Sequence, residues 1–218
     1  MITPKDLRQN SWASEYPRYR FVIGALILFA HFSVGINFFV VAPLFPLVID
    51  DFGVNRATAS LLIGLALLAH SFFGLPGGIL AVRFGLKRMY FVSWLMIGLS
   101  VLSAAAPNFG TLLMLRLLYG VGFGAIIPAT GPLLMQWFKP KEITIMNGLD
   151  IAILSLGVAI SVSLITPLAN AVGWQNALGV FGGIALLGAV LWGIFGRAES
   201  GSQISRAGIS LKEVRSLL

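Results

Sequence analysis

The chain alternates long apolar stretches with short polar ones. Residues 21–49, 57–82, 89–115, 117–138 and 151–196 contain no Asp, Glu, Lys or Arg. A membrane-spanning helix needs about 20 apolar residues, so the last of these stretches is long enough for two spans. Turn signals divide it near residues 170–174, and they divide 89–115 near 107–110. The pattern therefore predicts six membrane-spanning helices, at about 21–48, 57–81, 89–106, 112–136, 144–169 and 175–196.

The composition points to the same all-α membrane class. Of the 218 residues, 57% are hydrophobic and 11% are charged, and the mean hydropathy is +0.91. Soluble domains carry about 25% charged residues, which excludes a soluble enzyme, and the high hydropathy excludes a disordered chain. There is no Cys and there are two His, so we expect no metal site. No phosphate-binding loop or protease nucleophile is present, and we predict neither a cofactor nor an enzyme.

The placement of the basic residues predicts an orientation. Lys plus Arg is 15 against 8 for Asp plus Glu. With the N-terminus in the cytoplasm, every basic residue except Arg56 and Arg116 lies on the cytoplasmic side, as the positive-inside rule requires. Both termini are therefore expected to be cytoplasmic: segment 1–20, a transmembrane domain at 21–196, and a linker or tail at 197–218. The positive charge needs no nucleic-acid partner, and a bacterial inner membrane is the predicted location.

The two halves of the chain resemble each other weakly. Residues 80–85 match residues 168–173 at an offset of 88. Three spans separate such copies, and three is odd, so the copies have opposite orientations in the bilayer. The sequence therefore predicts an inverted 3+3 repeat, with copies at about 21–106 and 112–196.

A motif follows the second predicted span. The sequence there reads Gly78-Ile-Leu-Ala-Val82-Arg83-Phe-Gly85-Leu86-Lys87-Arg88, and span four carries Arg116-Leu-Leu-Tyr-Gly120-Val-Gly122. The first resembles the cytoplasmic loop signature of the major facilitator superfamily, and the second is similar to the Arg-x-x-x-Gly-x-Gly pattern of that family. The resemblance covers about residues 30–196 and matches the N-terminal one of the family's two six-span domains. The loop motif consists of Gly78, Arg83, Gly85, Lys87 and Arg88.

The sequence departs from the family pattern in this loop and in span five. The acidic loop position holds Val82, and one basic position holds Leu86. In the family that acid belongs to a charge network that latches the cytoplasmic side, so a different latch is expected here. Gly148 and Gly157 match the start of the antiporter pattern, but Ser161 stands where its ending should continue. Symport or uniport is therefore favoured over antiport.

The resemblance implies a function and a partner. Such a half moves a small-molecule solute by alternating access, rocking against a second six-helix domain. That domain is a C-terminal half, a separate chain or another copy of this chain, and one copy alone is expected not to transport. The coupling ion, proton or Na⁺, stays open. The alternative function is a membrane scaffold or assembly subunit that has the same fold.

Arg116 is the one basic residue inside a predicted span. A charge within a span is costly and usually functional. Either the side chain faces span one and takes part in substrate or proton coupling, as the resemblance implies, or it snorkels to the interface or caps backbone carbonyls. Small residues dominate helix contacts in lipid. We therefore expect close helix packing at Gly120, Gly122, Gly124 and Gly157.

Asp150 is the one acidic residue inside a predicted span. It shares a helix face with Asn147 and Gly157, three and seven residues away. This stripe of polar and small residues predicts a cavity or a helix interface. Asp150 is interpreted either as a protonatable or cation-pairing group, or as the partner of a loop Lys or Arg.

Further polar residues within the spans are candidates for coupling or binding. His31 and His70 lie near the membrane centre, where an imidazole that changes charge near neutral pH can relay protons. The alternative for each is a neutral packing residue. Asn37 is expected to line a cavity or to hydrogen-bond between helices. The full set of substrate or coupling candidates is Arg116, Asp150, His31, His70, Asn37 and Asn147.

Overall fold

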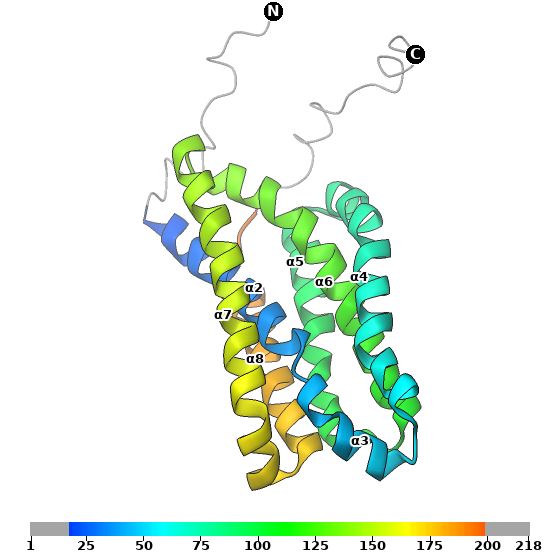
Figure 1. Ribbon diagram of the computed structural model, residues 1–218. Helices are drawn as coiled ribbons and strands as arrows, with labels where there is room; N and C mark the ends of the chain where they lie inside the picture. The colour runs from blue at the N-terminus through cyan, green and yellow to red at the C-terminus, as the bar shows by residue number, and fades with distance from the viewer. Residues whose placement is uncertain (1–17, 199–218) are drawn as a thin grey trace, which may run out of the picture.

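The structure is a computed structural model that describes residues 18–198. Within this range the chain is helical and has no strand. Its elements in chain order are α2 (Tyr19–Phe38), the 3₁₀ helix η1 (Ala42–Leu44), α3 (Phe45–Phe52), α4 (Arg56–Phe84), α5 (Leu86–Gly98), the 3₁₀ helix η2 (Leu99–Ala105), α6 (Phe109–Trp137), α7 (Pro140–Val172) and α8 (Trp174–Phe195) (Figure 1). In the described range, six helical segments are long and apolar enough to cross a membrane. The six predicted spans are confirmed, and the chain is a multi-pass integral membrane protein.

The two ends of the bundle differ in charge. The Tyr19 hydroxyl donates to Phe195 O at 2.6 Å, so α2 begins where α8 ends. The positive-inside rule predicts that the basic end is the cytoplasmic one, as in the sequence analysis, and the orientation stays a prediction. The predicted segment 1–20 and tail 197–218 lie almost entirely outside the described residues. At the cytoplasmic end lie Arg18, Arg20, Arg83, Lys87, Arg88, Lys139, Lys141 and Arg197, while Asp50, Asp51 and Arg56 lie at the other.

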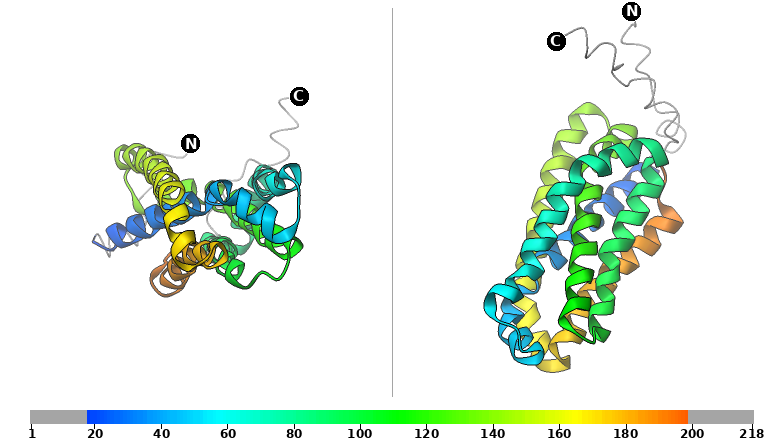
Figure 2. Two further views of the ribbon diagram at one scale, coloured as in Figure 1. Left: turned by 60° about the horizontal axis from the view of Figure 1, so that its bottom comes forward. Right: turned by 90° about the vertical axis from the view of Figure 1, so that its right-hand side faces the viewer.

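The helices differ in how deeply they are buried. In Figure 1, α7 runs along one side of the bundle and α4 along the other, and Figure 2 shows the elongated bundle from two other directions. Of the most apolar window of α6, 61% is buried, against 17% for both α4 and α7. α6 packs on α4 and α5, while α2 packs on α7 and α8. α6 is therefore the central helix, and one face each of α4 and α7 is left uncovered.

Glycines let the central helix approach its neighbours. A Cβ added to Gly120 would overlap Ala66 O of α4, and one added to Gly124 would lie 2.5 Å from His70 O of the same helix. Gly122 leaves equally little room beside α5, and Gly157 of α7 leaves little beside α2. Close packing of this kind supplies much of the attraction between helices in lipid. These contacts fix the relative depth and rotation of the helices that carry the polar residues.

The first span is broken in its outer half. α2 ends at Phe38, and the chain continues through η1 into α3. Pro43 has no N–H, so Phe39 O cannot form the usual bond four residues ahead. Ala42 N donates to Phe39 O instead, at 2.9 Å. α6 contains Pro128 and Pro132 and yet stays helical throughout, so the prolines of the two spans have different consequences.

Two turns in the bundle share one backbone conformation. Gly85, between α4 and α5, has φ +87° and ψ 143°, and Gly173, between α7 and α8, has φ +86° and ψ 147°. A residue with a side chain rarely adopts this region. The two glycines are 88 residues apart and lie at opposite ends of the bundle. This match supports the inverted repeat that the sequence predicts.

Candidate functional site

Two charged side chains are buried between the described helices. Arg116 on α6 is 2% exposed, and Asp150 on α7 is 5% exposed. They do not pair with each other, because each has its own partner on α2: Asn37 for Arg116 and His31 for Asp150. Six residues of helix separate these partners, which is about 9 Å along the axis. The interior of the bundle therefore holds two separate polar sites.

The first is the Arg116 site, made by Asn37, Arg116 and Tyr119. Arg116 Nη1 donates to Asn37 O at 2.8 Å, and the Tyr119 hydroxyl donates to Val34 O at 2.9 Å. Asn37 O is among the last four carbonyls of α2, which have no helical donor. The broken first span thus ends in free carbonyls with a partial negative charge, and Arg116 caps one of them. Arg116 faces span one, and its burial excludes snorkelling.

The Arg116 site keeps unused hydrogen-bonding capacity. Arg116 Nε and Asn37 Oδ1 are both buried and have no hydrogen-bond partner within the described chain. Asn37 Nδ2 donates to Ser33 O at 3.0 Å and to Phe181 O of α8 at 3.2 Å, so the amide is held in place. No acidic side chain among residues 18–198 forms an ion pair with Arg116. The guanidinium is thus a buried positive charge without an acidic counter-charge, an arrangement that favours an anion.

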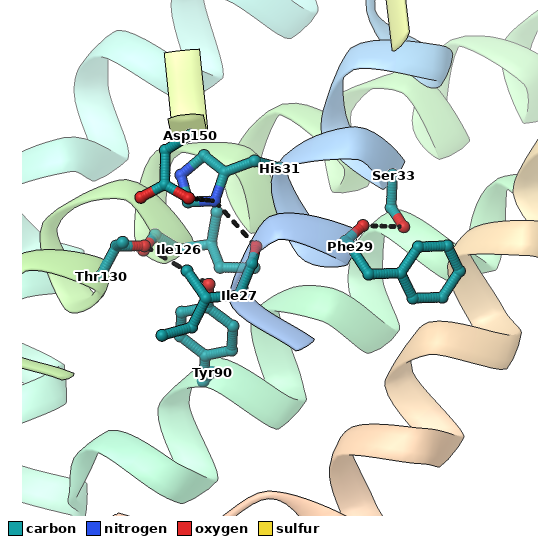
Figure 3. A network of polar contacts seen from close by, with 8 residues as sticks. All are labelled: Ile27, Phe29, His31, Ser33, Tyr90, Ile126, Thr130 and Asp150. Atoms are coloured by element: carbon teal, nitrogen blue, oxygen red, sulfur yellow. Dashed lines mark hydrogen bonds and ion pairs between the residues drawn. The ribbon is translucent and has the colours of Figure 1, made fainter. Parts of the chain in front are cut away.

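The second is the His31–Asp150 pair (Figure 3). His31 Nδ1 lies 3.4 Å from Asp150 Oδ1 and 3.0 Å from Ile27 O, and His31, like Asp150, is 5% exposed. A carbonyl oxygen only accepts, so we assign the hydrogen to Nδ1. Within the described chain His31 Nε2 makes no hydrogen bond. Asp150 pairs with a histidine of another span, and the alternative interpretation, in which its partner is a loop Lys or Arg, is wrong.

Two hydroxyl groups lie beside this pair, from α5 and α6. The Thr130 hydroxyl donates to Ile126 O at 3.0 Å, and the Tyr90 hydroxyl lies 3.4 Å from Thr130 Oγ1. Both therefore have acceptors other than Asp150, whose two carboxylate oxygens are buried and accept no hydrogen bond from a described residue. Figure 3 shows the four side chains of α2, α5, α6 and α7 converging on one place.

Other candidates from the sequence lie elsewhere. His70 is half-buried and stacks on Phe123 with the ring centroids 3.8 Å apart, and its Nδ1 has no hydrogen-bond partner in the described chain. Asn147 is exposed. The rest of its stripe forms a helix interface, where Gly157 meets the backbone of Phe32 on α2. Neither His70 nor Asn147 joins the two buried sites.

The loop motif surrounds the turn between α4 and α5. Gly85 supplies its positive φ, and Gly78 lies half-buried on α4 about two turns earlier. Arg83, Lys87 and Arg88 are exposed. Among residues 18–198 none of these three has an acidic partner within ion-pair distance, in line with Val82 at the acidic position of the motif. On the described residues, the cytoplasmic end is instead tied by Arg20 and Glu142, 3.2 Å apart.

Sequence reasoning did not single out two residues of these sites. Tyr119 lies one turn after Arg116 and therefore faces the same helix, a spacing that was available in the sequence. Tyr90 lies on α5, whereas the two sequence candidates in its site, His31 and Asp150, lie on α2 and α7. No local spacing in the sequence therefore marks Tyr90. Among residues 18–198 no group of His, Asp and Glu side chains could hold a metal ion.

A six-span bundle with buried, incompletely paired charges defines a polytopic α-helical membrane protein with polar sites inside its span. The comparison with known families identifies it further. The model of the major facilitator superfamily matches residues 27–216, and the chain belongs to this family.

Curated relatives are about one quarter identical to the chain over the aligned residues. It is 24% identical over 176 residues to an uncharacterized protein of Campylobacter jejuni, covering 80% of the chain and 55% of the relative. It is 28% identical over 163 residues to a hexuronate transporter of Bacillus subtilis, covering 74% of the chain and 39% of that transporter. It is 28% identical over 186 residues to a 4-hydroxybenzoate transporter of Pseudomonas putida, covering 84% of the chain and 42% of that transporter. The chain thus spans about half or less of the length of these relatives.

Proposed function

We propose that the chain is the N-terminal six-helix domain of a secondary transporter for a small carboxylate, and that Arg116 is the residue that attracts the anion. The proposal places it in a bacterial inner membrane, where it works by alternating access against a second six-helix domain. The observation that carries the proposal is the buried guanidinium, which has an unused Nε and no acidic partner within the described chain.

The chemistry of a guanidinium favours a carboxylate. Its planar N–H groups match the two oxygens of a carboxylate, and charge-assisted bonds of this kind are about twice as strong as neutral ones. Among the described residues Arg116 is the only Arg or Lys that is buried, which suits a solute with a single negative charge. Hexuronate and 4-hydroxybenzoate, in the names of two relatives, are carboxylates as well.

The second domain is proposed to lie against α4 and α7. These are the least buried spans, and their uncovered faces are apolar: Leu68 and Leu75 of α4 are 66% and 77% exposed, and Ile151 of α7 is 71% exposed. Six helices supply one wall of a transport cavity, so a single 218-residue copy is expected to give no saturable uptake. The partner is a C-terminal half, a separate chain or a second copy.

The test is uptake of labelled glucuronate and benzoate by the whole natural polypeptide in liposomes. Glucose and benzyl alcohol serve as neutral counterparts. We expect saturable uptake of at least one carboxylate and none of its neutral counterpart. Arg116→Ala should abolish this uptake, while the control Arg56→Ala, an exposed arginine outside the bundle interior, should retain it. Equal uptake of the neutral compounds would contradict the assignment, and no uptake of any probe would favour the scaffold alternative.

A further inference from the structure

We propose that His31 and Asp150 together bind one proton at the contact between α2 and α7, and that this proton drives the solute movement proposed above. The binding of the proton stands on the geometry of the pair alone. Its role in driving transport rests on the proposed function. The ligand of this site is therefore the proton itself, and the site is separate from that of Arg116.

The first support is the environment of the carboxylate. Asp150 is 5% exposed, and neither of its oxygens accepts a hydrogen bond from a described residue. The nearby hydroxyl hydrogens of Thr130 and Tyr90 have other acceptors. A buried ionised carboxylate that accepts no hydrogen bond from a described residue is held at a large cost in free energy. The site therefore needs a positive charge or a proton at the carboxylate.

The second support is the count of charges around the pair. Without a proton the pair carries one buried negative charge; with one proton it is neutral, whichever residue holds that proton; with two it carries a positive charge. The other titratable group beside it, Tyr90 of α5, is neutral in its usual state. Arg20 and Glu142, the nearest charges on α2 and α7, compensate each other at the cytoplasmic end. A single proton is therefore the occupancy that leaves no buried net charge.

The third support is that the pair has defined atoms to accept the proton. His31 Nδ1 already carries a hydrogen that faces Ile27 O and lies near Asp150 Oδ1. Nε2 makes no hydrogen bond within the described chain, so it can accept a proton from a hydronium ion, and Asp150 then neutralises the imidazolium. Alternatively the carboxylate accepts the proton directly. In both forms one N–H or O–H bond is made, and the proton comes from a hydronium ion that leaves water behind.

The position of the pair links its proton to a helix contact. His31 lies on α2 and Asp150 on α7, and the two helices pack closely further along, where Gly157 meets Phe32. Loss of the proton leaves a negative charge at this contact, and access to water relieves it. A ligand that binds one state more tightly shifts the balance between states. The proton thus favours the packed state, and its release favours the state in which α2 and α7 admit water.

The binding of the proton is tested without any solute. The natural polypeptide with His70→Gln, which leaves one histidine in residues 1–218, is labelled with ¹⁵N-histidine and titrated by NMR in lipid nanodiscs between about pH 5 and 9. We expect His31 to be protonated in part of this range. Asp150→Asn should lower its proton affinity about tenfold or more, since an opposite charge within 4–6 Å has effects of this size. Glu142→Gln, eight residues earlier on α7, is the matched control and should change the proton affinity of His31 little.

A second variant covers the case in which Asp150 holds the proton. In His31→Gln the carboxyl group is left alone, and its protonated form should give an infrared carbonyl band that Asp150→Asn removes. The proposal is overturned if the imidazole stays neutral and no carboxylic-acid band occurs at any pH tested. If His31 is the residue that holds the proton, the proposal is also overturned when Asp150→Asn leaves the His31 titration unchanged in a folded variant.

The driving role is tested separately in liposomes that carry a pH gradient. Uptake that is saturable but independent of the gradient overturns the coupling and leaves the proposed function standing. Absence of any uptake overturns the proposed function, while the titration of the pair still decides whether the proton is bound. The two failures are therefore distinguishable.

Discussion

The Arg116 site and the His31–Asp150 pair bury charges of opposite sign to nearly the same extent, and their partners differ in kind. Arg116 is held by a backbone carbonyl at the end of α2, whose partial charge does not change with pH. Asp150 is paired with a histidine, the residue type whose side chain can gain or lose a charge near physiological pH. The comparison indicates that the first site is a permanent positive charge and the second a switchable one.

The permanence of the first charge has a further consequence. A helix C-terminus supplies roughly half of one negative charge, so it compensates Arg116 only in part. The remainder is available to an anion. The His31–Asp150 pair becomes neutral by taking up one proton and then has no charge left to offer. The two sites are therefore suited to different ligands, an anion and a proton, although about 9 Å of α2 separates their partners.

The largest effect is expected for Arg116→Ala. It removes the anion-attracting charge and leaves Asn37 O without its donor. A charge-assisted hydrogen bond is worth about 2 kcal/mol, so the free energy of unfolding should fall by roughly that amount and uptake of the carboxylate by about 100-fold or more. Equilibrium unfolding in detergent and initial uptake rates measure the two effects. Unchanged uptake in a folded variant would remove the distinction between the sites.

The next effect in size is expected for Asp150→Asn. The amide keeps the shape of the side chain but cannot carry the charge that the pair exchanges. Accumulation driven by a pH gradient should fall about tenfold, while exchange of labelled for unlabelled solute without a gradient should persist. The ratio of the two rates is the measurement. A loss of exchange equal to the loss of accumulation would place Asp150 with Arg116 in binding the solute.

The sequence predicts the spans well and their breaks poorly. Six spans follow from the charge-free stretches, because lipid requires long apolar helices. The prolines at 43 and 46 and those at 128 and 132 give the same signal for bending. The first pair accompanies a 3₁₀ segment and a break, but α6 stays continuous. α6 is central and packed on several helices, and such tertiary packing is not visible in a local pattern.

The candidate site was predictable residue by residue but not as a set of contacts. A lone Arg and a lone Asp within the spans are visible in the sequence, and the family resemblance offered an Arg116 that faces span one as one of two interpretations. The partner of Asp150 was not visible in the sequence, because it depends on the rotation of α7 against α2. That rotation is set by close contacts such as the one between Gly157 and Phe32, which join residues more than 100 positions apart.

A smaller effect is expected for His31→Gln when Asp150 is already Asn. In the wild-type background this substitution removes one member of a pair that shares a proton, so gradient-driven accumulation should fall about tenfold. In the Asp150→Asn background the shared proton is already lost, and the second substitution should add less than about twofold. Such non-additivity is the mark of residues that act together. Independent, multiplying losses in the two backgrounds would mean that the residues do not form one proton site.

The smallest effects distinguish the two tyrosines. The Tyr119 hydroxyl donates to Val34 O at 2.9 Å, whereas the Tyr90 hydroxyl lies 3.4 Å from Thr130. A neutral hydrogen bond contributes about 1 kcal/mol, and less when it is long, so Tyr119→Phe should lower the free energy of unfolding by about that amount and Tyr90→Phe by less. Equilibrium unfolding of both variants at several pH values tests this. If Tyr90→Phe cost more, and only at high pH, its hydroxyl would have to turn toward the ionised Asp150. The carboxylate would then not depend on a proton alone, and the contrast between a permanent and a switchable charge would weaken.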